Sequence, residues 1–431
     1  MAITLTGCLG GGTTTLPSCT VSGRIVDGTG TGVSDVVLCF SGGTTGTSTT
    51  DKNGYWSKSG VKGAVKIKPA KTGWVFKPAE TTIDTALNAS PTAFAFAAAK
   101  SNEASDNPPG DDKAITFADQ GFEMLIRYTI NKPTGDILLS DVAELESLHI
   151  CSMPGEDGMS IRSLDGIENL TALKDIDLGG NQIADLSPLS SLQGLRNLNL
   201  STNPIRDIGP LASIATLESL DLSYNSIADL ITLAKLTNLQ ELNLQDNRIT
   251  DISPLAALTN LERLSICFNE VNDVSPLANL TNLQELRLEC NQIIDVSPLA
   301  NLINLQVLFL YSNQINDPSP LGNLVNLEYL NISDNQISDI ASFAGLTGLR
   351  ELHLTYNEIR DISCLANLTN LQDLGLKANL ISDISPLAGH TQLQYLSLYF
   401  NLLDTDDSVT CEVIDTLLEA GVKVTWKCQS L

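Results

Sequence analysis

The chain has 431 residues, of which 42% are hydrophobic and 17% are charged. This length exceeds that of one compact core and predicts two or more units or a repeat array. No run approaches the roughly 18 apolar residues that a membrane-spanning helix requires, so no such helix is predicted. The formal net charge of −25 would repel a phosphate backbone and argues against nucleic acid as a partner. Residues 1–100 carry +4 and the remainder −29, which predicts two units with different surfaces.

The N-terminal segment contains the short motif LTGC, ending at Cys8, followed by the stretch GGGTTT. The motif resembles a bacterial lipobox, whose Cys is acylated after signal cleavage, and a Gly-rich stretch makes a flexible tether. The resemblance implies that residues 1–19 are a truncated lipoprotein signal and tether with a lipid anchor at Cys8. Because no basic residue precedes Cys8, this interpretation needs a start upstream of Met1, and a chance match of the short motif is the alternative.

Residues 20–99 alternate apolar and polar side chains between turn signals, as in GRIVDGTG and DVVLCF. This pattern predicts a small antiparallel β-sandwich. The segment resembles the carboxypeptidase regulatory-like (transthyretin-like) domain at Gly23, Val26-Asp27, Gly30, Gly32-Val33, Val36–Leu38, Thr49-Thr50-Asp51 and Gly54-Tyr55. The resemblance implies an accessory spacer without an active site. Small domains benefit from disulfides, and Cys19–Cys39 is a candidate pair that spacing alone does not establish.

Residues 100–113 contain Pro-Pro-Gly and no apolar residue except Ala, which predicts a linker. Beyond the linker, Asn recurs every 22 residues after a variant of LxxLxL, at Asn181, Asn203, Asn225, Asn247, Asn269, Asn291, Asn313, Asn335, Asn357, Asn379 and Asn401. This period and pattern predict a leucine-rich repeat solenoid. The array resembles the 22-residue repeats of bacterial internalins and related surface proteins.

The repeat predicts how each coil folds. Side chains alternate along a strand, so Ile176 and Leu178 point inward, and stacked coils form a parallel sheet over a continuous core. The repeat Asn is expected to turn inward and bind backbone groups. An Asp four residues later, as in DISPLA, is expected to be the N-cap of a short 3-10 or helical turn on the convex side. A row of cation-binding Asp residues is the less favoured alternative.

A solenoid needs a cap at each end. Residues 114–170 are predicted to be an N-terminal cap with the first repeat, and they resemble the internalin-type cap. Residues 171–403 hold the repeats, and residues 404–431 are predicted to be a C-terminal cap made of a helix and a strand. Cys411 and Cys428 flank these two elements and are a candidate disulfide.

The sequence lacks the common catalytic and metal-binding motifs. The sequence has no Gly-rich phosphate loop, no GxSxG and no HExxH, and its three His residues are scattered. No enzymatic activity, metal or cofactor is therefore predicted. Cys267 and Cys290 lie in adjacent coils, where a disulfide or two small thiols is favoured over a functional site.

The positions six, four and two residues before each repeat Asn point outward from the predicted concave sheet. In the coil of Asn313 they hold Val307, Phe309 and Tyr311, and Tyr329 follows in the next coil. Clustered aromatic residues beside Arg are typical of interface hot spots, although Phe and Tyr also suit strands for reasons of sheet propensity. The predicted partner-binding residues are Arg263, Arg287, Glu289, Val307, Phe309, Tyr311, Tyr329, His353, Tyr395 and Tyr399.

The sequence therefore predicts a monomeric, non-enzymatic bacterial protein of the cell envelope or extracellular space, whose concave face binds another protein. The resemblance to internalins implies recognition of a protein on the surface of a host or neighbouring cell. The alternative is an intracellular scaffold or enzyme regulator, since similar repeats occur in phosphatase-binding proteins. The N-terminal sandwich and the number of cysteines argue against that alternative.

Overall fold

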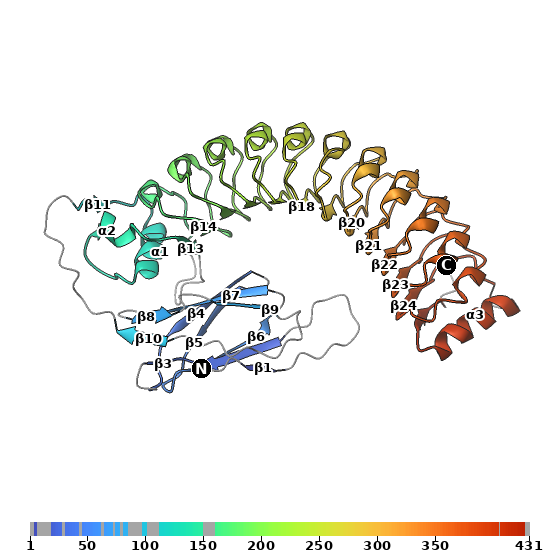
Figure 1. The fold of residues 1–431 in the computed structure, drawn as a ribbon, viewed down its shortest axis with the longest axis horizontal. Helices are drawn as coiled ribbons and strands as arrows, with labels where there is room; N and C mark the ends of the chain where they lie inside the picture. The colour runs from blue at the N-terminus through green and yellow to red at the C-terminus, as the bar shows by residue number, and fades with distance from the viewer. Residues whose placement is uncertain are drawn as a thin grey trace. The chain divides into compact units, whose positions relative to one another are not determined.

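The computed structural model describes residues 4–6, 19–27, 31–42, 45–61, 64–71, 74–77, 81–84, 97–100, 112–149, 160–404 and 406–426. The chain forms two compact units, Met1–Leu173 and Lys174–Leu431, and the course of each can be followed in Figure 1. Within the described ranges, no helix is long and apolar enough to cross a membrane.

The N-terminal strands form three small sheets, with the orders β1-β2-β6, β3-β10-β8 and β5-β4-β7-β9. All of their strand pairs are antiparallel except β3 with β10, which is parallel. The strands are β1 (Thr4–Thr6), β2 (Cys19–Arg24), β3 (Val26–Asp27), β4 (Val37–Gly42), β5 (Gly46–Thr49), β6 (Tyr55–Val61), β7 (Ala64–Ala70), β8 (Trp74–Lys77), β9 (Thr81–Asp84) and β10 (Ala97–Lys100).

The sandwich is held together by an apolar core drawn from these sheets. Leu38, Phe40, Trp56 and Ile67 are all buried in it, and the rings of Phe40 and Trp56 meet edge to face with centroids 5.8 Å apart. Aromatic pairs of this geometry add to the stabilisation that burial provides. The predicted small sandwich is therefore confirmed.

A tight turn joins this core to β6. The Asp51 carboxylate accepts hydrogen bonds from the backbone N–H groups of Asn53 and Tyr55, at 2.8 and 2.9 Å. Gly54 has a φ of +80°, and a Cβ there would lie 2.2 Å from the Ile25 carbonyl oxygen. The glycine of the DKNG stretch is therefore required both by backbone conformation and by close packing.

The second part of the first unit contains the helix α1 (Gln120–Ile130). Asp119 caps its start by accepting from the Phe122 N–H at 2.9 Å, and Asn131 ends it in the left-handed conformation with a φ of 61°. Both ends therefore have the residue types that favour helix termini. The remaining elements are β11 (Ala114–Ile115), β12 (Ile137–Leu138), α2 (Leu139–Val142), β13 (Ser147–His149) and the 3-10 helix η1 (Ile167–Asn169).

The repeats form a parallel sheet whose order follows the chain from β13 to β25. In Figure 1 the strands line the inner, concave side of the solenoid and the short helices line its outer side. Strands one period apart pair in register, as in Leu286 with Leu308. The repeat strands are β14 (Asp175–Asp177), β15 (Asn197–Asn199), β16 (Ser219–Asp221), β17 (Glu241–Asn243), β18 (Arg263–Ser265), β19 (Glu285–Arg287), β20 (Val307–Phe309), β21 (Tyr329–Asn331), β22 (Glu351–His353), β23 (Asp373–Gly375) and β24 (Tyr395–Ser397).

The convex side consists of 3-10 helices, as predicted, and the core between them and the sheet is filled with buried Leu and Ile. The helices are η2 (Ser187–Ser191), η3 (Gly209–Ser213), η4 (Ile231–Lys235), η5 (Ser253–Ala257), η6 (Ser275–Leu277), η7 (Ser297–Asn301), η8 (Ser319–Asn323), η9 (Ala341–Gly345), η10 (Ser363–Asn367) and η11 (Ser385–Leu387). The predicted leucine-rich repeat solenoid is confirmed.

The repeat Asn has the structural role that the sequence predicts. The side chain of Asn291 accepts from the Val271 N–H at 2.9 Å and donates to the carbonyl oxygens of Ile266 and Leu288, both at 3.0 Å. It therefore connects two coils through backbone groups that the solenoid buries. The preceding residue, Cys290, has a φ of 55°, which turns the chain out of the strand.

The Asp that follows each of the first ten repeat Asn residues does not occupy the predicted N-cap position. In η2 the N-cap residue is Leu186, and Asp185 lies one residue earlier. Asp185 accepts from the Ser187 backbone N–H at 2.9 Å and from the Ser187 hydroxyl at 2.7 Å. These hydrogen bonds, the hydroxyl foremost, lower the pKa of Asp185. The carboxylate thus closes a local turn that starts the helix, which is an Asx-turn rather than an N-cap.

The C-terminal cap consists of α3 (Ser408–Glu419) and β25 (Lys423–Thr425). Asp407 caps α3 by accepting from the Thr410 N–H at 2.8 Å, and β25 extends the sheet by pairing with β24. A helix covering the last coil prevents the open end of the core from meeting solvent.

The cysteines are only partly as predicted. Cys267 and Cys290 are thiols, so the disulfide alternative for this pair is wrong; Cys267 instead faces the Ser265 hydroxyl at 3.4 Å. Cys39 is disulfide-bonded, whereas the Cys19 side chain lies outside the described residues, as do Cys8 and Cys428. Cys411 is also a thiol, so the candidate disulfide Cys411–Cys428 is wrong. The pair Cys19–Cys39 stays a prediction, as does lipidation of Cys8.

Candidate protein-binding face

Three rings from successive strands lie side by side on the concave face. The ring centroids of Phe309 and Tyr329 are 4.5 Å apart with a tilt of 34°, and those of Tyr329 and His353 are 5.5 Å apart with a tilt of 49°. In the register of the sheet, Val307 lies beside Tyr329, and Phe309 is two strands away from His353. We call Phe309, Tyr329 and His353 the aromatic centre. All three are half-buried on the outward side of the sheet, so they are not core residues.

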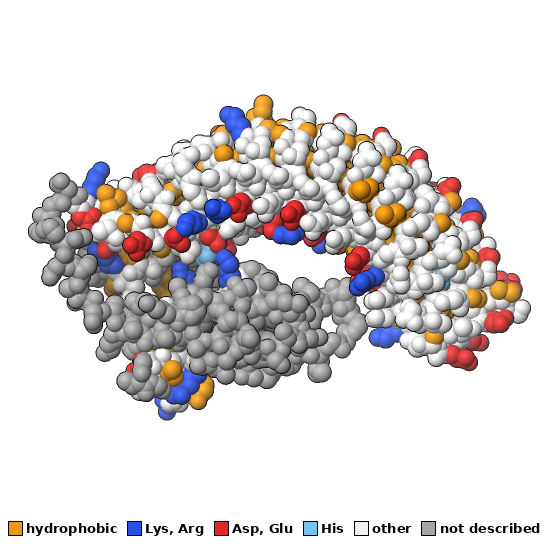
Figure 2. Space-filling view, in the orientation of Figure 1, with side chains coloured by type: hydrophobic (Ala, Val, Ile, Leu, Met, Phe, Trp, Pro, Cys, Tyr) orange, Lys and Arg blue, Asp and Glu red, His pale blue; other side chains and the backbone are white. Residues whose placement is uncertain are grey.

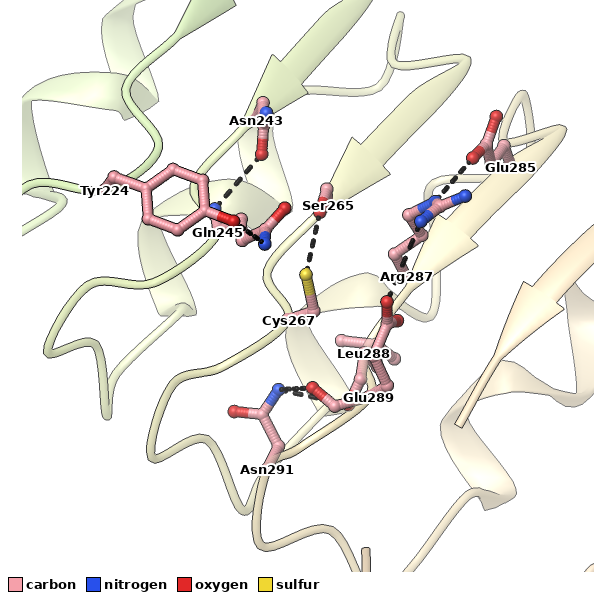
Figure 3. Close-up of polar contacts among 10 residues, drawn as sticks. All are labelled: Tyr224, Asn243, Gln245, Ser265, Cys267, Glu285, Arg287, Leu288, Glu289 and Asn291. Atoms are coloured by element: carbon pink, nitrogen blue, oxygen red, sulfur yellow. Dashed lines mark hydrogen bonds and ion pairs between the residues drawn. The ribbon is translucent and has the colours of Figure 1, made fainter. Parts of the chain in front are cut away.

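Arg287 lies between the aromatic centre and two carboxylates, and Figure 3 shows its contacts with Glu285 and Glu289. Its guanidinium carbon lies 4.2 Å from the Phe309 ring centroid, a distance suited to a cation–π interaction. Its Nε donates to Glu285 Oε1 at 2.8 Å, and a terminal nitrogen lies 3.8 Å from Glu289 Oε1. Arg287 is therefore held between two carboxylates and one ring before any partner arrives.

Glu289 departs from the prediction of an exposed contact residue, because it is only 3% exposed. The side chain lies in one row with Cys267 and Tyr311, which occupy the same repeat position, two residues before the repeat Asn, in the two neighbouring coils. Desolvation raises the pKa of Glu289, with Arg287 opposing it. Burial, with a further contribution from Glu289, raises the pKa of Tyr311 to about 12. Glu289 can therefore act on a partner mainly through its charge.

The other predicted residues are dispersed. Arg263 is exposed and forms an ion pair with Glu241 on the adjacent strand. Tyr395 lies three strands beyond Tyr329, where its hydroxyl is 3.4 Å from the Thr425 hydroxyl. Tyr399 packs against Phe400, with centroids 6.3 Å apart. The structure thus brings Arg287, Val307, Phe309, Tyr311, Tyr329 and His353 together and leaves Arg263, Tyr395 and Tyr399 apart.

Sequence reasoning missed a set of aromatic residues on the edge of the concave face, at the position directly before the repeat Asn. Each has a φ between 54° and 57° and is between 45% and 53% exposed. A bulky residue in the left-handed region is uncommon. The set could have been found by comparing the coils position by position; its members are Tyr224, Phe268, Tyr356 and Phe400.

Two of these aromatic residues enclose a cation. Lys377 Nζ lies 5.1 Å from the Tyr356 ring centroid and 5.7 Å from that of Phe400. At the other end of the set, Gln245 donates to the Tyr224 hydroxyl at 2.7 Å (Figure 3). These side chains therefore have intramolecular contacts as well as solvent exposure.

Beside the strands, the flank of the solenoid is charged and polar. Figure 2 shows acidic and basic side chains spaced along the inner edge of the solenoid. Two open hollows of about 520 and 410 Å³ lie there, both including Asn326 and Glu328 in their walls. No group of three or more His, Cys, Asp or Glu residues among the described side chains could hold a metal ion.

Comparison with known proteins identifies the family. The family model "Leucine Rich repeats (2 copies)" matches residues 171–213, 215–257, 259–301, 303–346 and 347–389. An internalin (inlF) of Listeria monocytogenes has 35% sequence identity and a TM-score of 0.62, over 73% of this chain and 96% of its own. The chain therefore belongs to the leucine-rich repeat family and is internalin-like.

More distant structures share the fold. A leucine-rich repeat protein of Leptospira interrogans has 22% identity and a TM-score of 0.53, over 67% of this chain and 85% of its own. The plant peptide hormone receptor RGFR1, in complex with RGF2, has 23% identity and a TM-score of 0.54, over 61% of this chain and 45% of its own. No curated protein matches the chain.

Proposed function

We propose that the chain is a non-enzymatic cell-surface or secreted recognition module that binds a protein through the concave face of its solenoid. The observation that carries this proposal is the contiguity of Phe309, Tyr329 and His353, with Arg287 stacked on Phe309. Interface hot spots are enriched in Tyr and Arg, and each large aromatic side chain can bury about 150–250 Å². A preorganised aromatic surface of this kind gains most when a partner covers it.

The relatives support this proposal by analogy. The match to an internalin extends over nearly all of that protein's chain, and the plant peptide hormone receptor of the same fold was solved in complex with RGF2. Because the same fold can serve unrelated functions, the argument for this chain depends on its own concave side chains.

The N-terminal segments fit a surface location. We interpret the sandwich as a carboxypeptidase regulatory-like spacer and Cys8 as a lipid anchor, so that the solenoid is held away from the envelope. The disulfide at Cys39 supports an oxidising compartment over the alternative of an intracellular scaffold. Recovery of the native protein from a cytoplasmic fraction with Cys39 reduced would argue for that alternative.

The experiment is affinity capture from envelope extracts and candidate target cells with the purified chain. Wild type is compared with a Phe309→Ala/Tyr311→Ala/Tyr329→Ala variant, and hot-spot losses should exceed about 2 kcal/mol. A specific captured protein should therefore disappear with the variant.

The matched control is Ile231→Ala on the convex helix η4, where the side chain is 70% exposed. Thermal unfolding must show that all three proteins are equally folded. A captured protein that is retained by the aromatic variant and lost by Ile231→Ala would move the binding site to the convex side.

A further inference from the structure

The outward positions of the concave sheet are predominantly acidic. Across the coils of Asn181 to Asn401, the positions six, four and two residues before each Asn hold eight acidic residues and three basic ones. The three basic residues are Arg263, Arg287 and Lys377. Because a face with this excess attracts cations, it discriminates between partners by their charge.

The basic side chains on this face already have intramolecular partners. Arg263 is paired with Glu241, and Arg287 with Glu285 and Glu289. Lys377 lies between two aromatic rings. The basic groups are therefore already paired within the chain, and the excess charge that a partner meets on this face is that of carboxylates.

Two of these acidic residues lie together next to the aromatic centre. Glu351 on β22 and Asp373 on β23 are directly opposite each other in the sheet, an arrangement of like charges that is destabilising. Asp373 Oδ1 is buried and accepts no hydrogen bond from the described residues. Desolvation raises the pKa of Asp373; His353 opposes this shift and Glu351 adds to it.

The outward residue nearest these carboxylates, Gly375, is itself buried. Gly375 occupies the outward position next to Asp373, paired with His353 on one side and Ser397 on the other. A Cβ there would lie 3.1 Å from both His353 Nδ1 and Thr355 Oγ1. The side chains of His353 and Thr355 therefore pack closely over this glycine. We call Glu351 and Asp373 the acidic pair.

A second carboxylate oxygen without a partner lies on the other side of the aromatic centre. Glu289 is 3% exposed, and its Oε2 accepts no hydrogen bond from the part of the chain that the structure describes. Glu289 and Asp373 belong to coils four strands apart, a separation of roughly 19 Å at about 4.8 Å per strand. The aromatic centre is therefore bracketed by two negative sites.

We propose that the protein ligand presents a basic segment to this face, with a Lys or Arg side chain lying against the acidic pair while neighbouring residues cover the aromatic centre. This inference rests on the proposed function and specifies the partner's chemistry. An ammonium or guanidinium group beside the acidic pair would relieve the repulsion between Asp373 and Glu351. An acidic segment would add a like charge to a face that has no uncommitted cation to receive it.

The test uses the full chain and a fluorescein-labelled twelve-residue peptide of alternating Lys and Ser. Fluorescence anisotropy is measured at two salt concentrations, with an alternating Glu and Ser peptide for comparison. Glu351→Gln/Asp373→Asn should weaken binding of the Lys peptide by about tenfold at low salt. The Glu peptide should not bind.

A polycation could bind anywhere on a chain of net charge −25, so the control removes the same charge elsewhere. Glu412→Gln/Asp415→Asn lies on the exposed side of α3 and should change the affinity by less than about twofold. Equal losses in both double variants, or no binding of the Lys peptide to wild type, would overturn the proposal.

The same variants separate this inference from the proposed function. If a captured protein is lost with the Phe309, Tyr311 and Tyr329 variant but retained by Glu351→Gln/Asp373→Asn, the concave face binds a protein and the basic-segment inference is wrong. Loss with both variants supports both. Retention by both would contradict the proposed function itself.

Discussion

Replacing Asn291 by Ala should destabilise the solenoid where the candidate face is built. The Asn291 side chain satisfies the Val271 N–H and the carbonyl oxygens of Ile266 and Leu288. Each buried backbone group left without a partner costs about 1–3 kcal/mol. Three such groups, at the lower end of that range, predict a loss of about 3 kcal/mol in the free energy of unfolding.

Urea unfolding followed by circular dichroism measures this loss, with hydrogen exchange of the Val271 amide as a local readout, because stacked repeats can unfold in parts. The control is Asn304→Ala. Asn304 is exposed and donates one hydrogen bond, to the Thr281 carbonyl at 2.8 Å, so its loss should cost less than about 1 kcal/mol. Equal destabilisation by the two variants would refute the interpretation of the repeat Asn as a connector of buried backbone groups.

Three further predictions concern protonation and local turns. His390 is buried without a hydrogen-bond partner for either ring nitrogen among the described residues, and desolvation lowers its pKa. His390→Leu should therefore raise the free energy of unfolding by about 1–3 kcal/mol. As the pH falls through the ordinary His pKa of about 6.5, only the unfolded wild-type chain gains a proton at this residue, so wild type should lose stability that the variant keeps. Superimposable pH profiles of thermal unfolding would contradict this. Burial raises the pKa of Cys267 to about 12, so iodoacetamide at pH 8 should label it far more slowly in the folded chain than in urea, as mass spectrometry would show; equal rates would contradict its burial. Asp185→Ala should lower stability by about 0.5–1 kcal/mol at pH 7. That difference should vanish as the pH falls through the lowered pKa of Asp185, and a difference that persists in acid would mean that the carboxylate charge is not its cause.

The sequence was sufficient to predict the fold because one pattern is repeated many times. The spacing of Leu and Asn specifies which side chains enter the core, and stacking then follows from in-register strands. The same frame placed Phe309 and Tyr329 on the concave face, since alternation along a strand depends only on local geometry.

The remaining features depend on neighbours in other coils, which a single repeat does not encode. Glu289 is at an outward position but is buried, in a row with Cys267 and Tyr311 of the adjacent coils. His390 takes the core position that Leu or Ile fills in the other ten coils. Asp185 lies one residue before the N-cap instead of at it. The sequence does not distinguish the two positions, because an Asx-turn and an N-cap use the same kind of side chain.

The central claim is that a protein partner contacts the concave face at the aromatic centre. Photocrosslinking tests it most directly, with p-benzoyl-phenylalanine placed at Asn331, which pairs in register with Phe309 and His353, or at Ile231 on the convex side. Crosslinks to the captured protein from position 331 and not from position 231 are the predicted result. Crosslinks from position 231 alone would contradict the account.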